Sequence, residues 1–339
     1  MSVESRATSD IQSIREELLR ARREAGDNER GTMTATTMNF VVYIDRPEYR
    51  DWILERAEKI AEKHPARLLI LDANADRSGA SLATSLRQGT TTVRTERVDI
   101  GVGDLTAEQT YAVANSLSIP DLRTVLWWTG VRIAGEQRFE ELLELADDVV
   151  VDSSGALKDE TSVRELVGFL SRHRTVALQD LAYMRLAPWQ DMIAQFFDDT
   201  QLREELFSIK HVTVASGSDA EGLYLGGWLG SRLGWVACHR AMFCDRGGIE
   251  IPFSLTRSGE IRRVTSVRLE TQKSVYTAEL AQDDGRVVAL RIEGARARPD
   301  RIVPLQSVDN ASLIERAILE RSTNEIFETS LRMVGRLLA

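Results

Sequence analysis

Histidines and cysteines have the clearest capacity for acid–base, nucleophilic or metal chemistry, and in this chain they are few and scattered. No two of the four histidines have the spacing of ligands for one metal ion: His64, His173, His211 and His239. Cys238, His239 and Cys244 could supply three ligands, but a fourth is missing and the spacing matches no zinc pattern. No serine lies in a G-x-S-x-G nucleophile motif. We therefore expect no metal, no cofactor and no catalytic residue, and hence a protein that is not an enzyme.

The most suggestive local motif is residues 211–222 (HVTVASGSDAEG), in which a strand runs through Gly217 into a helix. Backbone N–H groups at such a turn can bind phosphate, and the candidate residues here are Ser216, Gly217 and Ser218. Gly217 and Gly222 have the outer spacing of a Walker loop, but its Lys and Ser/Thr are absent. The simpler interpretation is a capping box of Ser218 with Glu221. A sugar-phosphate- or nucleotide-binding enzyme or sensor using Gly217 to Glu221 is the alternative function.

Three tryptophans are candidates for contact with a partner protein. Trp127 and Trp128 end an apolar strand, so their side chains must point to opposite faces of a sheet. Trp189 follows Pro188 at the start of a helix. Burial in the core is the commoner fate of tryptophan, but tryptophan is also enriched among the residues that dominate protein interfaces. We expect at least one of the three to be accessible and to bind a partner.

Composition limits the class of protein. The chain has 339 residues, a formal charge of −9 and a pI near 5.2, with 43% hydrophobic and 28% charged residues. These values are typical of a folded protein of two domains and disfavour nucleic acid or a membrane surface as a partner. The polar start and the lack of a long apolar run predict a cytoplasmic protein. Two cysteines exclude a scaffold built on disulfides.

The first part of the chain predicts a helix, a linker and then an α/β domain. Residues 1–37 form the first segment, with an amphipathic helix from Ser9 to Arg23 followed by a linker from Gly26 to Gly31. Residues 38–171 alternate between β-branched apolar runs and helical patterns. The strands are expected at 39–45, 67–72, 81–86, 91–100, 124–128 and 148–152. This alternation indicates a largely parallel sheet covered by helices.

Residues 172–339 are expected to form a second α/β domain. Its strand–helix pattern continues to about residue 233 and then changes to a β meander over 249–303, separated by turn signals such as Ser258-Gly259. One long amphipathic helix, over 309–338, closes the chain. The fold class is therefore α/β, with largely parallel helix-covered sheets in two α/β units, followed by an antiparallel β meander and a C-terminal helix.

Five segments together resemble a known family. They are residues 38–73, 119–130 (IPDLRTVLWWTG), 145–154 (LADDVVVDSS), 180–199 (DLAYMRLAPWQDMIAQFFDD) and 223–235 (LYLGGWLGSRLGW). Their order and intervals resemble the OpcA family, the glucose-6-phosphate dehydrogenase assembly proteins of cyanobacteria and actinobacteria. The similarity covers residues 38 to about 240.

The resemblance implies a non-catalytic partner that binds glucose-6-phosphate dehydrogenase, activates it and so promotes the oxidative pentose phosphate pathway. It also implies that a cysteine pair, here Cys238 and Cys244, makes the protein redox-responsive, with thioredoxin as a second partner. In a helix the two Cα atoms would be about 9 Å apart, whereas a disulfide tolerates about 7 Å. We expect the two residues to form a reversible disulfide, as the resemblance implies, and the segment between them must therefore bend.

Overall fold

The computed structural model describes residues 36–75, 79–88, 91–155, 160–173, 175–259, 263–281, 286–306, 308–320 and 324–339, with residues 12, 13, 16 and 20. The helix expected from Ser9 to Arg23 and the linker after it otherwise lie outside the described residues. The chain divides into two compact units. Unit 1 comprises residues 1–151, 173–179 and 314–321, and unit 2 comprises residues 152–172, 180–313 and 322–339.

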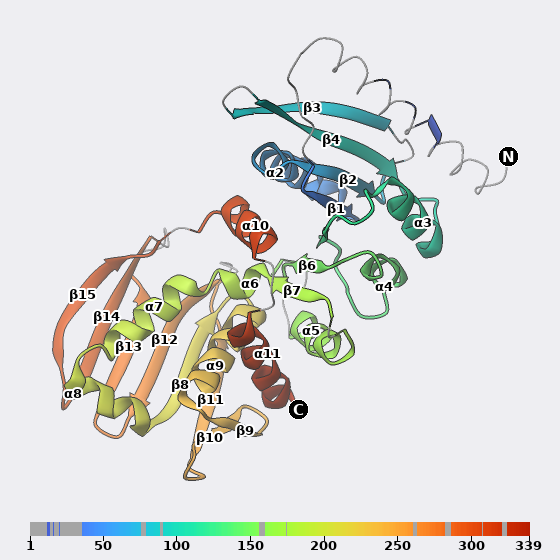
Figure 1. Cartoon of the computed structure of the whole chain (residues 1–339). Coiled ribbons are helices and arrows are strands. Elements are labelled where there is room, and N and C mark those ends of the chain that lie inside the picture. Colours follow the sequence, from blue (N-terminus) through green and yellow to red (C-terminus); the bar gives the residue numbers. More distant parts are fainter. Residues whose placement is uncertain are drawn as a thin grey trace. The chain divides into compact units, whose positions relative to one another are not determined.

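Unit 1 is built on a seven-stranded sheet (Figure 1). Its strands are β1 (Met38–Ile44), β2 (Ala66–Asp72), β3 (Gly79–Gln88), β4 (Thr91–Gly101), β5 (Thr124–Trp128), β6 (Asp148–Val151) and β7 (Ala177–Asp180). They lie in the order β3-β4-β2-β1-β5-β6-β7, and β3 alone is shown to pair antiparallel. Without β3, the order along the sheet is third, second, first, fourth, fifth and sixth strand, which is the order of the doubly wound dinucleotide-binding fold.

Apolar runs explain why β1 and β2 lie at the centre of this sheet. Every residue of β1 (MNFVVYI) and of β2 (ARLLILD) is buried, as expected for parallel strands covered on both faces. The helical elements of this part of the chain are η1 (Pro47–Tyr49), α2 (Arg50–Lys63), α3 (Ala107–Leu117) and α4 (Gln137–Leu143). A reciprocal capping box between Thr106 and Gln109 begins α3.

Unit 2 contains an eight-stranded mixed sheet in the order β15-β14-β13-β12-β8-β11-β10-β9. The strands are β8 (Ile209–Ser216), β9 (Val236–His239), β10 (Met242–Cys244), β11 (Glu250–Arg257), β12 (Val264–Thr271), β13 (Ser274–Leu280), β14 (Val287–Gly294) and β15 (Arg298–Pro304). β8 pairs parallel with β11 and antiparallel with β12, so the meander continues directly from a central strand. The α/β fold class predicted from the sequence is confirmed, with a second sheet that is mixed.

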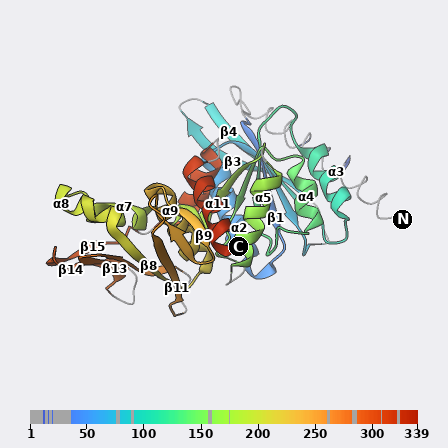
Figure 2. The ribbon, with the colours of Figure 1, turned by 90° about the horizontal axis from the view of Figure 1, so that it is seen from below.

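The helices α7 (Ala187–Phe196), α8 (Thr200–Arg203) and α9 (Asp219–Leu233) lie along one face of this sheet (Figure 2). The other helical elements that follow α4 are α5 (Thr161–Arg172), α6 (Leu181–Met184), η2 (Glu204–Ser208), α10 (Asn310–Leu319) and α11 (Glu325–Leu338). Glycines allow α9 to approach the sheet closely: an added Cβ at Gly222, Gly226 or Gly230 would meet the side chain of Leu255, Phe253 or Phe243.

The prediction of one long terminal helix over 309–338 is wrong. The chain forms α10 and α11, and Asn324 caps the second helix by accepting from the N–H groups of Ile326 and Phe327. α11 packs against α5, where Gly335 faces Val167, so α5 belongs to unit 2 although the expected boundary was residue 171. No helix among the described residues has the length and apolar character needed to span a bilayer.

Candidate functional site

The three candidate tryptophans are buried, so the prediction of an exposed tryptophan among them is wrong. Trp127, Trp128 and Trp189 are 2%, 2% and 4% exposed. Trp128 stacks on Tyr43 with ring centroids 4.1 Å apart, and its Nε1–H donates to the carbonyl of Arg132. Trp127 stacks on Phe40, while Trp189 lies on the buried face of α7. Both faces of β5 are covered, and therefore neither tryptophan that ends this strand reaches solvent.

The turn at Ser216, Gly217 and Ser218 is closed by its own hydrogen bonds. The Gly217 N–H donates to the carbonyl of Arg263, and the Ser218 N–H donates to Ser216 Oγ at 3.1 Å. Ser218 makes no side-chain cap bond and Glu221 turns instead to Arg185, so the capping box is not formed. Two of the three candidate N–H groups are thus engaged, and the Asp219 carboxylate lies at the same helix start. The geometry does not favour an anion here.

A polar cluster that the sequence did not reveal surrounds Arg185 in unit 2. Its guanidinium donates to Asp152 Oδ1 at 2.5 Å, to Glu221 Oε1 at 3.0 Å, to Ser154 Oγ and to Asn310 Oδ1. Burial raises the pKa of Glu221, although the neighbouring Arg185 opposes that rise. The arrangement joins residues far apart in the sequence around one cation.

A second polar cluster in unit 2 surrounds the carboxylate of Asp180. The Tyr224 hydroxyl donates to Asp180 Oδ2 at 2.6 Å, and the N–H groups of Ser153 and Ala182 donate to Oδ1. Burial, helped by the nearby Asp152 carboxylate, raises the pKa of Asp180. A carboxyl with a raised pKa is a feature of many acid–base sites, but every oxygen of this one is engaged within the protein. The sequence did contain one signal for these two polar clusters, namely carboxylates placed at strand ends. Asp152 directly follows the apolar strand β6, and Asp180 is the last residue of β7.

The crevice at which doubly wound proteins bind a dinucleotide lies between the carboxyl ends of β1 and β5. Here the turn after β1 (Asp45-Arg46-Pro47-Glu48-Tyr49) has no glycine, and side chains occupy it. Arg46 donates to the carbonyl of Thr129 at 3.2 Å, and Asp45 Oδ2 accepts from the Val131 N–H at 3.3 Å. These bonds join the two turns directly. The residues present therefore do not fit the pyrophosphate of NADP or NAD.

Arg138 fills the adjoining part of the same edge. From the start of α4 it donates to the carbonyls of Val102, Gly103 and Leu105, which follow β4, and to the Tyr43 hydroxyl. Burial raises the pKa of Tyr43, which stays a neutral phenol. The described residues at this edge of the sheet are held together by these internal hydrogen bonds.

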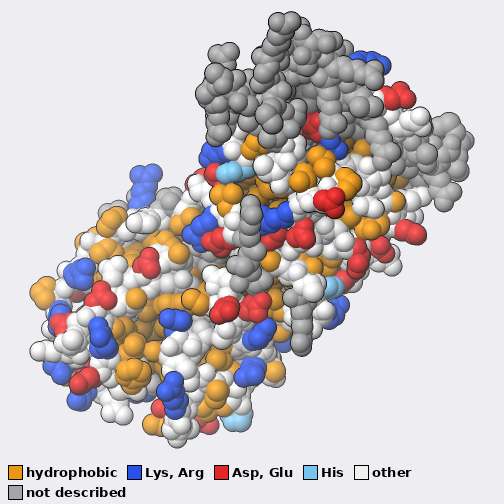
Figure 3. All heavy atoms as spheres, viewed as in Figure 1, with side chains coloured by type: hydrophobic (Ala, Val, Ile, Leu, Met, Phe, Trp, Pro, Cys, Tyr) orange, Lys and Arg blue, Asp and Glu red, His pale blue; other side chains and the backbone are white. Residues whose placement is uncertain are grey.

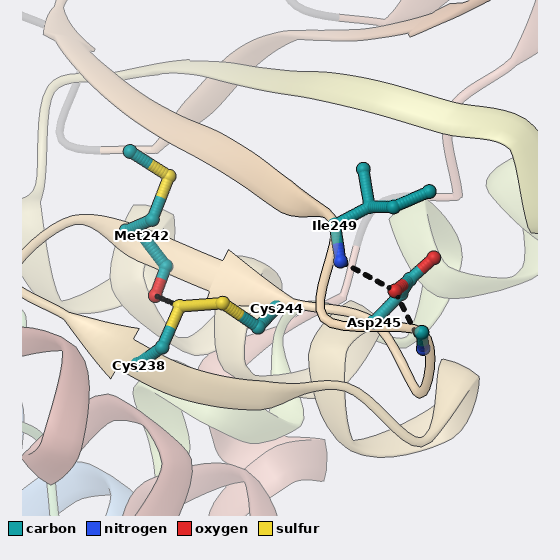
Figure 4. The surroundings of a disulfide bond; sticks show 6 residues. Cys238, Met242, Cys244, Asp245 and Ile249 are labelled. Carbon is teal, nitrogen blue, oxygen red and sulfur yellow. Dashed lines mark hydrogen bonds between the residues drawn. A yellow bond between two sulfur atoms is a disulfide. The ribbon is translucent and has the colours of Figure 1, made fainter.

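Cys238 and Cys244 form a disulfide that bridges the β9–β10 hairpin (Figure 4). Their Cα atoms are 5.8 Å apart, so the prediction that this segment bends and that the two cysteines pair is confirmed. Both residues are partly exposed, and Cys238 Sγ contacts the carbonyl of Met242. At the turn, the Ala241 N–H donates to the carbonyl of Leu337 near the end of α11.

One cavity of about 320 Å³ opens between α7, α8 and strands β14 and β15. Its lining mixes apolar and charged side chains, among them Phe196, Asp198, Leu290, Arg298 and Arg301. Arg298 is paired with Asp199 at 2.6 Å. The cavity does not include the turn at Gly217, and so it does not supply the cleft that the alternative function needs.

Strand order and the second mixed sheet define the class: an α/β protein whose first unit has the Rossmann order. The chain matches the family described as glucose-6-phosphate dehydrogenase subunit, with its N-terminal domain at residues 57–167 and its C-terminal domain at residues 176–331. The chain therefore belongs to the OpcA family, as its five distinctive segments predicted.

Two relatives and two solved structures extend this comparison. Proteins provisionally named OxPP cycle protein OpcA, from Synechocystis sp. and Nostoc punctiforme, are 24% and 27% identical over 83% and 53% of this chain. The matches span 65% and 40% of those relatives.

KijD10, a 3-ketoreductase from Actinomadura kijaniata in complex with NADP and TDP-benzene, has a TM-score of 0.50 at 14% identity, covering 89% of this chain and 96% of that one. An oxidoreductase of Desulfitobacterium hafniense also has a TM-score of 0.50, at 12% identity, covering 90% and 94%. The structural similarity shows the fold alone.

Proposed function

We propose that this chain is a non-catalytic subunit that binds glucose-6-phosphate dehydrogenase and raises its activity, promoting the oxidative pentose phosphate pathway. The observation that supports the proposal most is the match of both parts of the chain to the two domains of a glucose-6-phosphate dehydrogenase subunit. The filled crevice between β1 and β5 supports a role without its own dinucleotide. Activation then requires tighter binding to the active than to the resting form of the enzyme.

The Cys238–Cys244 disulfide is the proposed redox element. It is partly exposed on a hairpin, where a dithiol protein such as a thioredoxin can reach it. Exchange would convert the disulfide to two thiols, with two electrons and two protons supplied by the dithiol, which becomes a disulfide in turn. We expect the oxidised and reduced forms to activate the enzyme to different extents.

The test is a titration of the purified chain into the dehydrogenase of the same organism, following rate against glucose 6-phosphate concentration. A coupling free energy of about 1–3 kcal/mol would change the apparent substrate affinity roughly 5–150-fold. Oxidised chain, thioredoxin-reduced chain and a Cys238→Ser/Cys244→Ser variant form the three arms. An unchanged substrate dependence at saturating chain would refute the activator role. Equal activation in all three arms would refute only the redox element.

A further inference from the structure

The two faces of the eight-stranded sheet in unit 2 differ in what covers them. In β8 the side chains of Val212, Val214 and Ser216 are buried, whereas those of His211, Thr213 and Ala215 are partly exposed. The buried side is the one on which α7, α8 and α9 lie, and no described element of unit 2 lies along the other side (Figure 2). We call this second side the open face.

Strand pairing identifies the residues of the open face, because side chains directly opposite one another lie on the same side of a sheet. One row across the sheet consists of Ser254, Thr213, Arg268, Thr277 and Arg291. The next row consists of Thr256, Ala215, Ser266, Glu279, Ala289 and Ile302. Small and β-branched side chains predominate in both rows, so few side chains of these rows project far from the sheet.

The size of the open face suits a protein partner. Eight strands about 4.8 Å apart, each contributing about five residues of 3.3 Å, give roughly 600 Å², near the ~800 Å² that one partner contributes to a standard interface. Ile302, on the edge strand, is 69% exposed on this side. A surface of this area is larger than a small ligand needs.

The charge of the open face distinguishes between partners. The pairing register places on it the carboxylates of Glu250, Glu270, Glu279 and Glu293, together with Arg268, Arg291 and His211. Arg268 pairs with Glu270, and Arg291 pairs with Glu279, whereas Glu250 and Glu293 are exposed. Arg291 also donates to the carboxylate of Asp300 on β15, and His211 lies 3.9 Å from the Glu270 carboxylate. On the helix-covered side, side chains of both charges are spread among apolar ones (Figure 3). A second copy would set carboxylates against carboxylates, so the charge favours a different protein with a basic surface.

The disulfide lies at the border of the same face. Cys244 is opposite Glu250 and Met242 is opposite Pro252, whereas Phe243 between them points to Gly230 on the helix-covered side. A change in the Cys238–Cys244 bond would therefore alter the edge of the open face and leave the helix-covered core of the hairpin in place.

Resting on the proposed function, we propose that the open face of unit 2 binds a basic surface of glucose-6-phosphate dehydrogenase, with the disulfide at the margin of this contact. The rows of small polar side chains supply the contact area, the excess carboxylates supply charge complementarity, and the position of Cys244 connects the redox state to binding. Because the contact is electrostatic in part, its affinity decreases as the salt concentration rises.

The test compares variants of the full chain for affinity to the dehydrogenase of the same organism, measured by calorimetry at several salt concentrations. Glu250→Lys/Glu293→Lys reverses two exposed charges of the open face. Thr277→Trp places a bulky side chain on the same face, between Arg268 and Arg291 in the first row. Glu204→Lys in η2, which is exposed on the helix-covered side, is the matched control. We expect at least a tenfold loss of affinity for both open-face variants, a weaker salt dependence for the charge-reversal variant and no change for the control.

Each outcome has a distinct meaning. Unchanged affinity and activation in both open-face variants, with a wild-type chain that binds, would overturn the docking surface and leave the activator role standing. A wild-type chain that does not bind the dehydrogenase would overturn both. A self-dimer that Thr277→Trp dissociates while the dehydrogenase still binds would assign the open face to a second copy and overturn the proposal. Unfolding curves that match the wild type exclude misfolding as the cause of lost affinity.

Discussion

Gly227 shows how one position controls the packing of a helix. It lies on the side of α9 that faces α11, where an added Cβ would be 2.6 Å from the carbonyl oxygen of Ser330 and 2.7 Å from Val334 Cγ2. Ser330 is fully buried and its oxygen belongs to the backbone of a helix, so neither group can move without displacing α11. The two helices can be this close only because residue 227 has no side chain.

We predict that Gly227→Ala lowers the free energy of unfolding by about 1–3 kcal/mol, the usual effect of an extra group in a packed core. Denaturant unfolding would measure the change. Gly168→Ala in α5 is the matched control, because no atom lies within 4 Å of its added Cβ and alanine favours a helix interior by about 0.5–1 kcal/mol. Similar stabilities for the two variants would contradict the packing argument.

The β9–β10 hairpin is held at the level of the element by two independent means. Phe243 is fully buried against Trp235 and Phe253, with ring centroids 5.4 and 5.8 Å away. The disulfide closes the short loop between Cys238 and Cys244, which are six positions apart. The aromatic contacts remain after reduction, and so the hairpin should stay folded without the covalent bond.

Reduction should lower the stability of the chain by about 2 kcal/mol, which is the chain-entropy contribution of so short a loop. Denaturant unfolding with and without a dithiol reductant would measure this difference. The Cys238→Ser/Cys244→Ser variant should unfold like the reduced chain and should not respond to the reductant. If oxidised and reduced chains unfold at the same denaturant concentration, the bond makes no contribution to stability.

At the scale of the whole molecule, unit 1 has the strand order of dinucleotide-binding proteins without their binding turn. The fold positions the carboxyl ends of β1 and β5 side by side, but Arg46 and Asp45 hydrogen-bond across the gap. Burial raises the pKa of Asp45. A pyrophosphate would have to displace these side chains and would find no glycine turn to approach.

The isolated chain should therefore neither bind NADP nor oxidise glucose 6-phosphate. Titration of the chain into NADPH, followed by nucleotide fluorescence, would show no saturable change, with the dehydrogenase itself as the positive control. Saturable binding at micromolar concentrations, or turnover by the pure chain, would show that the crevice opens and would contradict the proposed non-catalytic role.

Local patterns in the sequence were enough to predict the α/β fold class, the family and the bend between the two cysteines. Runs such as RLLILD form strands because β-branched and leucine side chains suit a buried sheet. The pairing of Cys238 with Cys244 was implied by the family resemblance, and the reach of a disulfide then required the bend between them, because that limit depends on short-range geometry. Asn324 between two helical patterns was an available signal for the break between α10 and α11.

Exposure and assembly depended on contacts between residues distant in the sequence, and only the tertiary structure decided them. Trp127 and Trp128 are buried because helices cover both faces of β5, with Trp52 of α2 beside Trp127 and Phe139 of α4 beside Trp128, a fact that no local pattern contains. The cluster around Arg185 joins Asp152, Glu221 and Asn310 across more than a hundred positions. The open face exists because β8 inserts between β11 and β12, so its rows of side chains come from strands whose order is set by the packing of the whole unit.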